Sequence, residues 1–527
     1  MKMKLKTLIG VAVAVATTGT GSAADIAAVK AVADEICTIT ACGVKTNGIA
    51  FVDYVLRPEA ESDIRCRIEL PPAARWDGRM WGVGNSGWAG SFLPISQFSA
   101  WGTAVATTDL GTAAYTENGK SNEKVWPDCV RRDYDWRATH LMTVYAKRIV
   151  EAYYGRPPSR CYFDGGSCGG RQGIGEAIRF PEDYDGIVAH MPGNNPICNE
   201  VDDFILWKLT HDEAGKLLFT EDEMRAVSDA AVAYGASRTE RPFSGKVLAD
   251  PFFTADDVDG FLSLAVEKMP RLADPDLRSR LRRLFLGTEH RGRRMTYGKI
   301  PGSYLGDEMR RTWHAYFPQF LRSRGLTRAT ATLDDLDEFV RLYAPTYNAC
   351  SDDLEAFRRR GGKLIVTPGL EDQTDPPRVQ IAHFERVVSR LGGDLSAALS
   401  FYRVFPVPGC AHGGGKGRII TIPPDGPAVW RQMIDWREKG VAPERFMVPW
   451  KDEGVDIPVA PYPKRLVQDE YGNWIERTFD RLCCFFPFEP KLFKPGFAEF
   501  VGHPLLEIVE ARRDGKIERD PDKVLLL

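Results

Sequence analysis

Residues 160–173 read RCYFDGGSCGGRQG, and this stretch decides the fold. A short aromatic run leads into a glycine-rich turn and then into a segment, about 170–179, that is predicted to be helical. Gly165, Ser167 and Gly169 form the G-x-S-x-G pattern, in which a sharp strand-to-helix turn lifts a serine hydroxyl clear of the backbone. The flanking residues must be small, because side chains there would collide across the turn. The pattern predicts a nucleophilic serine.

The segments around this turn alternate between strands and helices. Strands are predicted at 80–83, 102–109, 160–164, 185–189, 361–369 and 400–407, and helices at 134–154, 170–179 and 379–391. Such alternation is typical of a parallel sheet in an α/β fold. It also favours a nucleophile turn over the alternative, a glycine-rich loop without chemistry.

The chain has 527 residues, enough for one large domain with an insertion or for two domains. Residues 196–345 are charge-rich and mostly helical in pattern, which indicates an inserted lid domain. We expect five parts: a signal peptide at 1–24, a first core part at 25–195, the lid at 196–345, a second core part at 346–440, and a C-terminal extension at 441–527.

The N-terminus has the pattern of a signal peptide. Lys2, Lys4 and Lys6 precede the apolar run 8–16, and Ser22-Ala23-Ala24 resembles a cleavage site. The run is too short to cross a bilayer, which weighs against a membrane anchor, and we also prefer export to a cytosolic N-terminal helix. We expect a secreted or periplasmic protein without a membrane partner. The net charge of −3, with no basic block, argues against a nucleic-acid partner.

The 11 cysteines bear on the same question, because most cysteines pair in an oxidising compartment. The odd number leaves at least one of them outside any internal pair. Disulfide bonds are therefore expected, with Cys37 or Cys42 joined to Cys66 as one plausible N-terminal bridge.

A serine nucleophile needs a general base, and the base follows the serine and the acid in this fold class. Among the eight histidines, His412 comes directly after a predicted strand, where a catalytic side chain projects from the carboxyl edge of a parallel sheet. We predict His412 as the base. His503, in the irregular tail, is the alternative base. The other possibility is that His412 is a solvated loop histidine without a catalytic role.

The orienting acid should follow the preceding strand, which ends in the acidic segment 370–375. Asp372 is the predicted acid, with Asp375 and Glu371 as alternatives. Acids that merely form a turn are the other reading. The oxyanion hole needs two backbone N–H groups, and we predict those of Cys168 and Gly87. For Gly87 the alternative is a plain glycine turn.

Several stretches together resemble the tannase/feruloyl esterase family of α/β-hydrolases, to which mono(hydroxyethyl) terephthalate hydrolase is related. They are residues 84–90, 108–111, 137–140, 162–173, 181–188, 353–357, 361–365 and 408–412. The resemblance implies an α/β-hydrolase fold with a helical lid. It also implies a secreted hydrolase of aromatic esters, with feruloyl and other hydroxycinnamoyl, galloyl or terephthalate substrates.

Two features depart from the family. The family usually has a disulfide beside the triad, but Gly166 and Gly413 stand at its two positions. A relocated bridge between Cys168 and Cys410 is one hypothesis, and two separate buried thiols are the other. The stretch 243–251 lacks the acidic cluster of the family's calcium loop, so we expect no metal there and no cofactor. The nearby acids at 256–259 fit a helix start better than a metal site.

We conclude that the sequence predicts a secreted serine esterase with Ser167, Asp372 and His412 as the catalytic triad. Its expected partner is a small-molecule or polysaccharide-linked aromatic ester. Two alternatives are an esterase for acetyl or lactone esters with the same triad, and a non-catalytic binding member of the family.

Overall fold

The structure is a computed structural model that describes residues 23–118, 120–122, 124–238, 246–248, 250–291, 293–306, 309, 316–413, 426–451, 453–469, 471 and 473–479. The predicted signal peptide falls outside this part apart from the start of α1 (Ala23–Lys30). Among the described residues, no helix combines the length and the apolar character needed to cross a membrane.

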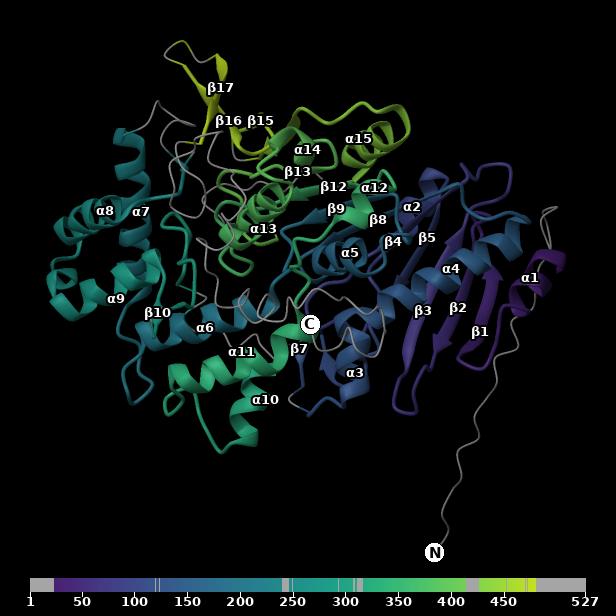
Figure 1. The fold of residues 1–527 in the computed structure, drawn as a ribbon, viewed down its shortest axis with the longest axis horizontal. Helices are drawn as coiled ribbons and strands as arrows, with labels where there is room; N and C mark the ends of the chain where they lie inside the picture. Colours follow the sequence, from purple (N-terminus) through teal and green to yellow (C-terminus); the bar gives the residue numbers. More distant parts are fainter. Residues whose placement is uncertain are drawn as a thin grey trace, which may run out of the picture.

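A nine-stranded sheet forms the centre of the molecule (Figure 1). Its strands are β1 (Cys37–Val44), β2 (Ala50–Leu56), β3 (Ile64–Leu70), β4 (Arg79–Val83), β5 (Ala104–Thr108), β8 (Arg160–Gly166), β9 (Gly186–His190), β12 (Lys363–Thr367) and β13 (Tyr402–Val404). They lie in the order β1-β2-β3-β5-β4-β8-β9-β12-β13. The strands predicted around the serine turn are confirmed, and the mixed α/β class with them.

The prediction of a parallel sheet is correct only from β5 to β13. Strands β1, β2 and β3 pair antiparallel with one another, and β3 pairs antiparallel with β5. The connections 45–49 and 57–63 are hairpin-length, and a parallel crossover needs a dozen or more residues.

Each face of the sheet has its own hydrophobic cluster because successive strand side chains point to opposite faces. Met80, Phe163 and Leu364 pack on one side, and their neighbours Trp81, Tyr162 and Ile365 pack on the other. The first cluster includes residues of α4 (Ala138–Tyr154), α5 (Cys168–Arg179) and α13 (Pro377–Arg390). The second includes residues of α2 (Ser96–Trp101) and α15 (Gly426–Lys439).

The helix predicted at 134–154 begins with a π-helical turn, η1 (Asp133–Arg137), and continues as α4. It ends at Gly155, whose φ of 73° suits glycine. Short elements complete the core: α3 (Asp128–Arg132), α12 (Glu355–Arg359), α14 (Leu395–Leu399), β6 (Thr116–Glu117) and β7 (Lys120–Ser121).

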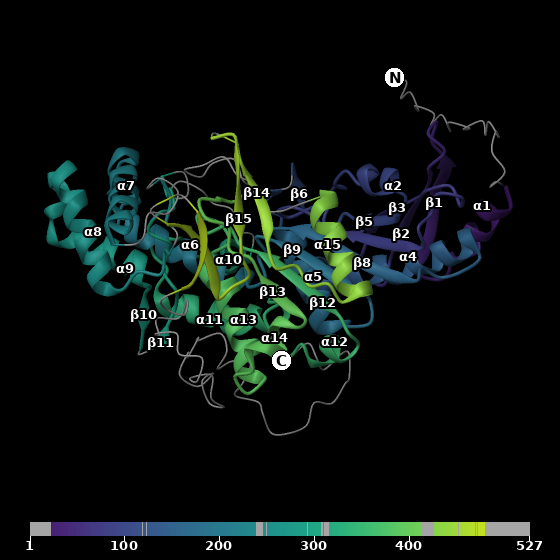
Figure 2. The ribbon, with the colours of Figure 1, turned by 90° about the horizontal axis from the view of Figure 1, so that it is seen from above.

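Strands β9 and β12 are parallel neighbours, so the long segment between them leaves the sheet and returns to it. This segment contains α6 (Pro196–Thr210), α7 (Glu221–Arg238), α8 (Ala255–Lys268), η3 (Pro270–Ala273), α9 (Pro275–Leu286), β10 (Glu289–His290), β11 (Arg293–Arg294), α10 (Tyr316–Ser323) and α11 (Leu333–Tyr347). Figures 1 and 2 place α7, α8 and α9 at the end of the molecule opposite β1.

The acids at 256–259 begin helix α8, as predicted. Thr254 and Asp257 form a capping box, in which each side chain accepts a hydrogen bond from the other residue's backbone N–H. After α15, the chain forms the two hairpins β14 (Phe446–Trp450) with β15 (Val455–Val459) and β16 (Lys464–Gln468) with β17 (Trp474–Thr478).

Candidate active site

Ser167 lies in a strained turn between β8 and α5. Its φ of 55° is costly for a residue with a side chain, by about 1–3 kcal/mol. Helix α5 begins directly at Cys168 rather than near Gly170, so the turn is tighter than predicted. A Cβ on Gly165 would lie 2.6 Å from the carbonyl carbon of Gly169, which explains the two glycines of the motif.

The structure brings the three predicted triad residues together from three separate loops. His412 Nε2 lies 3.1 Å from Ser167 Oγ, and His412 Nδ1 lies 2.9 Å from Asp372 Oδ2. The Asp372 side chain is fully buried, whereas that of His412 is 22% exposed. The second carboxylate oxygen of Asp372 accepts the backbone N–H groups of Thr374 and Asp375 at 2.9 and 2.8 Å. Asp372 is thereby fixed in the orientation that faces the imidazole.

The alternative acids and base have different positions. Asp375 is also buried beside the triad, with Oδ2 3.6 Å from His412 Nδ1 and 3.3 Å from Ser167 Oγ. The longer distance to Nδ1 favours Asp372 as the orienting acid. Glu371 donates its backbone N–H to the carbonyl of Cys410 at 2.9 Å, which ties the acid loop to the histidine loop. His503 lies outside the described residues.

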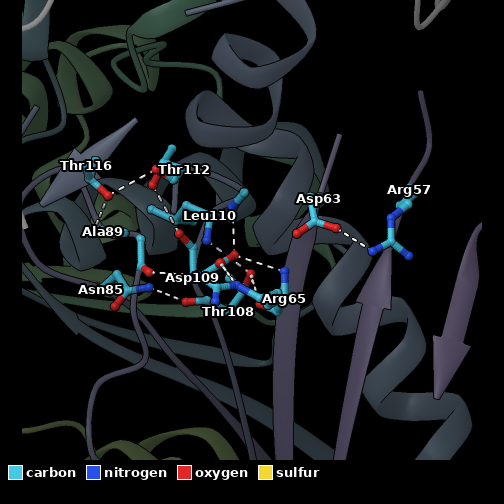
Figure 3. A network of polar contacts seen from close by, with 12 residues as sticks. Arg57, Asp63, Arg65, Asn85, Ala89, Thr108, Asp109, Leu110, Thr112 and Thr116 are labelled. Carbon is cyan, nitrogen blue, oxygen red and sulfur yellow. Dashed lines mark hydrogen bonds and ion pairs between the residues drawn. The ribbon is translucent and has the colours of Figure 1, made fainter. Parts of the chain in front are cut away.

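The loop 84–90 approaches the serine turn from the end of β4. The Gly169 N–H donates to the carbonyl of Asn85 at 2.7 Å, and the Asn85 N–H donates to Gln172 Oε1 at 2.7 Å. The side chain of Asn85 donates in turn to the carbonyl of Thr108 (Figure 3). These bonds join the loop to both α5 and the end of β5.

The carbonyl groups of this loop accept hydrogen bonds from the residues around it. The carbonyl oxygens of Trp88 and Ala89 accept hydrogen bonds from the hydroxyl groups of Thr112 and Thr116. The carbonyl oxygen of Gly90 accepts from the Arg65 guanidinium, and that of Gly87 accepts from the Tyr134 hydroxyl at 3.0 Å. The guanidinium of Arg65 is itself held by Asp109 at 2.6 Å (Figure 3). The backbone of the loop is therefore rigid before a substrate arrives.

The two predicted oxyanion donors lie on this loop and at the start of α5. Across the described chain, the N–H groups of Cys168, Ser86 and Gly87 donate to no protein acceptor. Cys168 is the first residue of α5, where the positive end of the helix dipole adds to its N–H. Gly87 stays a prediction, and Ser86, which sequence reasoning missed, is an equal candidate for the second donor.

Two residues from the segment between β9 and β12 contact the acid loop, and sequence reasoning missed both. Asn199 on α6 donates its side-chain amide to Asp375 Oδ1. Lys299 is buried, with Nζ 3.2 Å from the carbonyl oxygen of Gln373 and 3.6 Å from Asp202. Neither belongs to a local motif, so no signal in the sequence could have found them.

The expected disulfide bonds are not formed among the nine described cysteines. Cys37 pairs with Leu56 across β1 and β2, whereas Cys66 on β3 pairs with Tyr54. Strand β2 therefore lies between β1, which carries Cys37 and Cys42, and β3, which carries Cys66. Two strand spacings are about 10 Å, beyond the roughly 7 Å limit between bridged Cα atoms. The other two of the 11 cysteines, Cys483 and Cys484, lie outside the described residues.

The hypothesis of a Cys168–Cys410 bridge is also wrong for this structure. Cys168 packs in the cluster on the α5 side of the sheet, and Cys410 packs in the cluster on the opposite side. The Cys168 thiol donates to the Tyr134 hydroxyl at 3.5 Å and accepts from Arg171 Nη2 at 3.4 Å. These contacts agree with the alternative of two separate buried thiols.

Comparisons with solved structures agree with this architecture. Feruloyl esterase B from Aspergillus oryzae superposes with a TM-score of 0.71 at 21% identity, covering 84% of this chain and 97% of that one. Tannin acyl hydrolase from Aspergillus niger superposes with a TM-score of 0.65 at 18% identity, covering 86% and 94%. The predicted α/β-hydrolase fold is thereby confirmed.

Sequence comparisons reach most of the chain. A probable feruloyl esterase B-2 of Neosartorya fischeri is 25% identical over 457 residues, covering 76% of this chain and 81% of that protein. An uncharacterized esterase of Xanthomonas campestris pv. campestris is 28% identical over 479 residues, covering 80% and 81%. The family model described as tannase and feruloyl esterase matches residues 52–237 and 315–487. The chain therefore belongs to the tannase and feruloyl esterase family of carboxylic ester hydrolases.

Proposed function

We propose that this protein is a serine esterase that hydrolyses esters of aromatic carboxylic acids through an acyl-enzyme. The observation that carries the proposal is the pair of hydrogen bonds that links Ser167 Oγ to His412 Nε2 at 3.1 Å and His412 Nδ1 to Asp372 Oδ2 at 2.9 Å. A serine, an imidazole and a buried carboxylate in this order support nucleophilic catalysis. The names of the relatives support feruloyl, other hydroxycinnamoyl or galloyl esters as the substrate class.

In the first half-reaction, Ser167 Oγ attacks the ester carbonyl while its proton passes to His412 Nε2. Asp372 holds the Nδ1–H tautomer of the imidazole and stabilises the imidazolium that forms. The imidazolium then gives its proton to the departing alcohol, which leaves an acyl group on Ser167. In the second half-reaction, His412 takes a proton from water while the water oxygen attacks the acyl carbonyl. The imidazolium then returns a proton to Ser167 Oγ as the bond between the acyl group and the serine breaks and the acid leaves.

The negative charge on the carbonyl oxygen is stabilised by backbone donors. We assign this role to the N–H of Cys168 together with that of Gly87 or Ser86. These three groups lie on segments whose backbone is fixed by other hydrogen bonds, so they need little reorganisation during the reaction.

The proposal extends to the organisation of the chain. Residues 1–24 act as a signal peptide, the core is built from 25–195 and 346–440, residues 196–345 form the lid, and 441–527 form an extension. The enzyme is secreted or periplasmic, and its substrate is a small or polysaccharide-linked aromatic ester. N-terminal sequencing of exported protein should find a start near Asp25.

The test is ester hydrolysis by the wild type and by Ser167→Ala on p-nitrophenyl acetate, methyl ferulate, methyl gallate and mono(hydroxyethyl) terephthalate. Removing the nucleophile should lower kcat by about 10⁴-fold or more. Ser159→Ala, at the opposite end of β8, is the control and should keep full activity. Preference for acetate over the aromatic esters would favour the acetyl- or lactone-ester alternative. A folded protein inactive on every ester would favour a non-catalytic binding protein.

A further inference from the structure

A second buried carboxylate lies beside the catalytic atoms. Asp375 Oδ2 is 3.3 Å from Ser167 Oγ and 3.6 Å from His412 Nδ1. Its side chain is only 5% exposed. The mechanism above uses Asp372 and does not use Asp375, although both carboxylates face the same imidazole.

The position of Asp375 is fixed from several sides. Its Oδ1 accepts a hydrogen bond from the Asn199 amide, its N–H donates to Asp372 Oδ1, and its carbonyl accepts from Gln380 Nε2 at 2.9 Å. A Cβ on Gly193 would lie 2.9 Å from Asp375 Oδ1, so only a glycine leaves room for this carboxylate. A side chain held this closely is preorganised to act on its neighbours.

The charges around Asp375 make its ionisation matter for the triad. From its own loop it faces Asp372, from the loop after β13 it faces His412, and from α6 it faces the neutral Asn199. Lys299 contacts the Gln373 carbonyl of the same loop. Burial raises the pKa of Asp375 to about 6, Asp372 adds to the rise, and His412 opposes it. Asp375 therefore lies where a change in its charge acts directly on His412 and Ser167.

We propose that Asp375 is a second catalytic carboxylate, which shares with Asp372 the stabilisation of the imidazolium that forms on His412 when Ser167 attacks. This inference rests on the proposed function. When the serine proton reaches His412 Nε2, the ring becomes positive, and an ionised Asp375 3.6 Å from Nδ1 attracts it. At a pH where Asp375 is protonated, Asp372 alone supplies this attraction.

The test compares pH profiles of kcat/KM between pH 4 and 9 for the wild type, Asp375→Asn, Asp372→Asn and the double variant. Asp375→Asn keeps the shape of the side chain and removes its charge. It should lower the plateau about tenfold and move the acid limb about one unit to lower pH, because the imidazolium loses a nearby anion. The double variant should lose more than the product of the two single losses, because each carboxylate partly replaces the other.

Asn199→Ala provides an independent measurement if Asp375→Asn does not fold. It removes a donor to the ionised Asp375 and leaves the triad intact, so Asp375 keeps its proton to higher pH. The imidazolium then has less negative charge nearby, and the acid limb should move to lower pH, by less than in Asp375→Asn. Asp135→Asn is the matched control, since burial also raises the pKa of Asp135 to about 6, but this carboxylate contacts Tyr316 and lies near Arg171 instead of the triad. It should leave the acid limb in place.

Two results would overturn the proposal while leaving the proposed esterase function intact. The first is a double variant whose loss of kcat/KM equals the product of the two single losses, together with an acid limb that does not move in Asp375→Asn; Asp375 would then be a structural residue. Higher activity in Asp375→Asn would mean that the carboxylate competes with His412 for the serine proton. Failure of the esterase function itself would appear separately, as equal activity in the wild type and Ser167→Ala.

Discussion

Gly84 and Gly169 cross so closely that a Cβ on Gly84 would lie 2.5 Å from the Cα of Gly169. This contact joins the end of β4 to the first turn of α5, and it brings the loop that begins at Gly84 against the nucleophile turn. The obstructing atoms belong to the backbone, so no side-chain rotation can relieve a clash there.

Gly84→Ala should therefore destabilise the protein by about 1–3 kcal/mol or more. It should also lower kcat by pushing the 84–90 loop away from Ser167. Gly175→Ala, in the same helix α5, is the matched control, because its Cβ would meet Ala349 at an ordinary 3.6 Å. An alanine there should be neutral or stabilising by about 0.5–1 kcal/mol. Urea unfolding and ester hydrolysis measure both effects. Equal stability of the two variants would contradict the close backbone contact between Gly84 and Gly169.

His383 should make stability depend on pH. It is completely buried in α13, where it contacts the Tyr402 hydroxyl at 3.1 Å and the Ser351 carbonyl at 2.9 Å. Burial lowers the pKa of His383 to about 3, against 6.5 in an unfolded chain. Between pH 6.5 and 3 the unfolded state binds the proton and the folded state does not. The contribution of neutral His383 to the free energy of unfolding is complete above pH 6.5. It is lost as the pH falls, by up to about 1.4 kcal/mol per pH unit.

His383→Gln should flatten this part of the pH dependence. The measurement is urea unfolding at several pH values from 4 to 7 for the wild type and the variant. Phe384→Leu, at the buried neighbour of His383 in α13, supplies a control without a titrating group and is expected to keep the wild-type slope. Identical slopes in the wild type and His383→Gln would show that His383 is not held neutral.

Lys299 links the segment before α10 to the acid loop. Lys299→Met removes a buried ion pair with Asp202 and the hydrogen bond to the Gln373 carbonyl. Loss of one partner of a buried ion pair costs about 3–5 kcal/mol. Because Gln373 lies between Asp372 and Asp375, kcat should fall as well. Lys208→Met, at a partly exposed lysine on α6 that donates to Ala329, should change neither quantity much. A fall in stability without any change in kcat would show that Lys299 does not position the acid loop for catalysis.

Cys37, Cys42 and Cys66 are free in the structure, and the register of β1, β2 and β3 keeps Cys66 apart from the other two, so we expect all three to be thiols in the native protein. Denatured, unreduced protein treated with an alkylating reagent should carry the label on all three residues, as shown by peptide mass mapping. A reduced sample provides the reference for complete labelling. A peptide pair that links Cys66 to Cys37 or Cys42 would contradict the register.

The sequence by itself determined the parts of the site that depend on local spacing. The glycines around Ser167 are required by a turn only a few residues long, and the position of His412 after a predicted strand placed it at the carboxyl edge of the sheet. Alternating strands and helices likewise determined the α/β class. These signals are local because backbone sterics and side-chain periodicity act over a few residues.

Only the tertiary structure decided the relationships between distant segments. It distinguished Asp372 from Asp375 by the distance of each carboxylate to His412 Nδ1, 2.9 against 3.6 Å. It excluded the Cys37–Cys66 bridge through strand register, and it placed Asn199 from α6 against the acid loop. In each case the answer depends on how segments far apart in the chain pack, because packing sets the direction and distance of a side chain and composition and spacing do not.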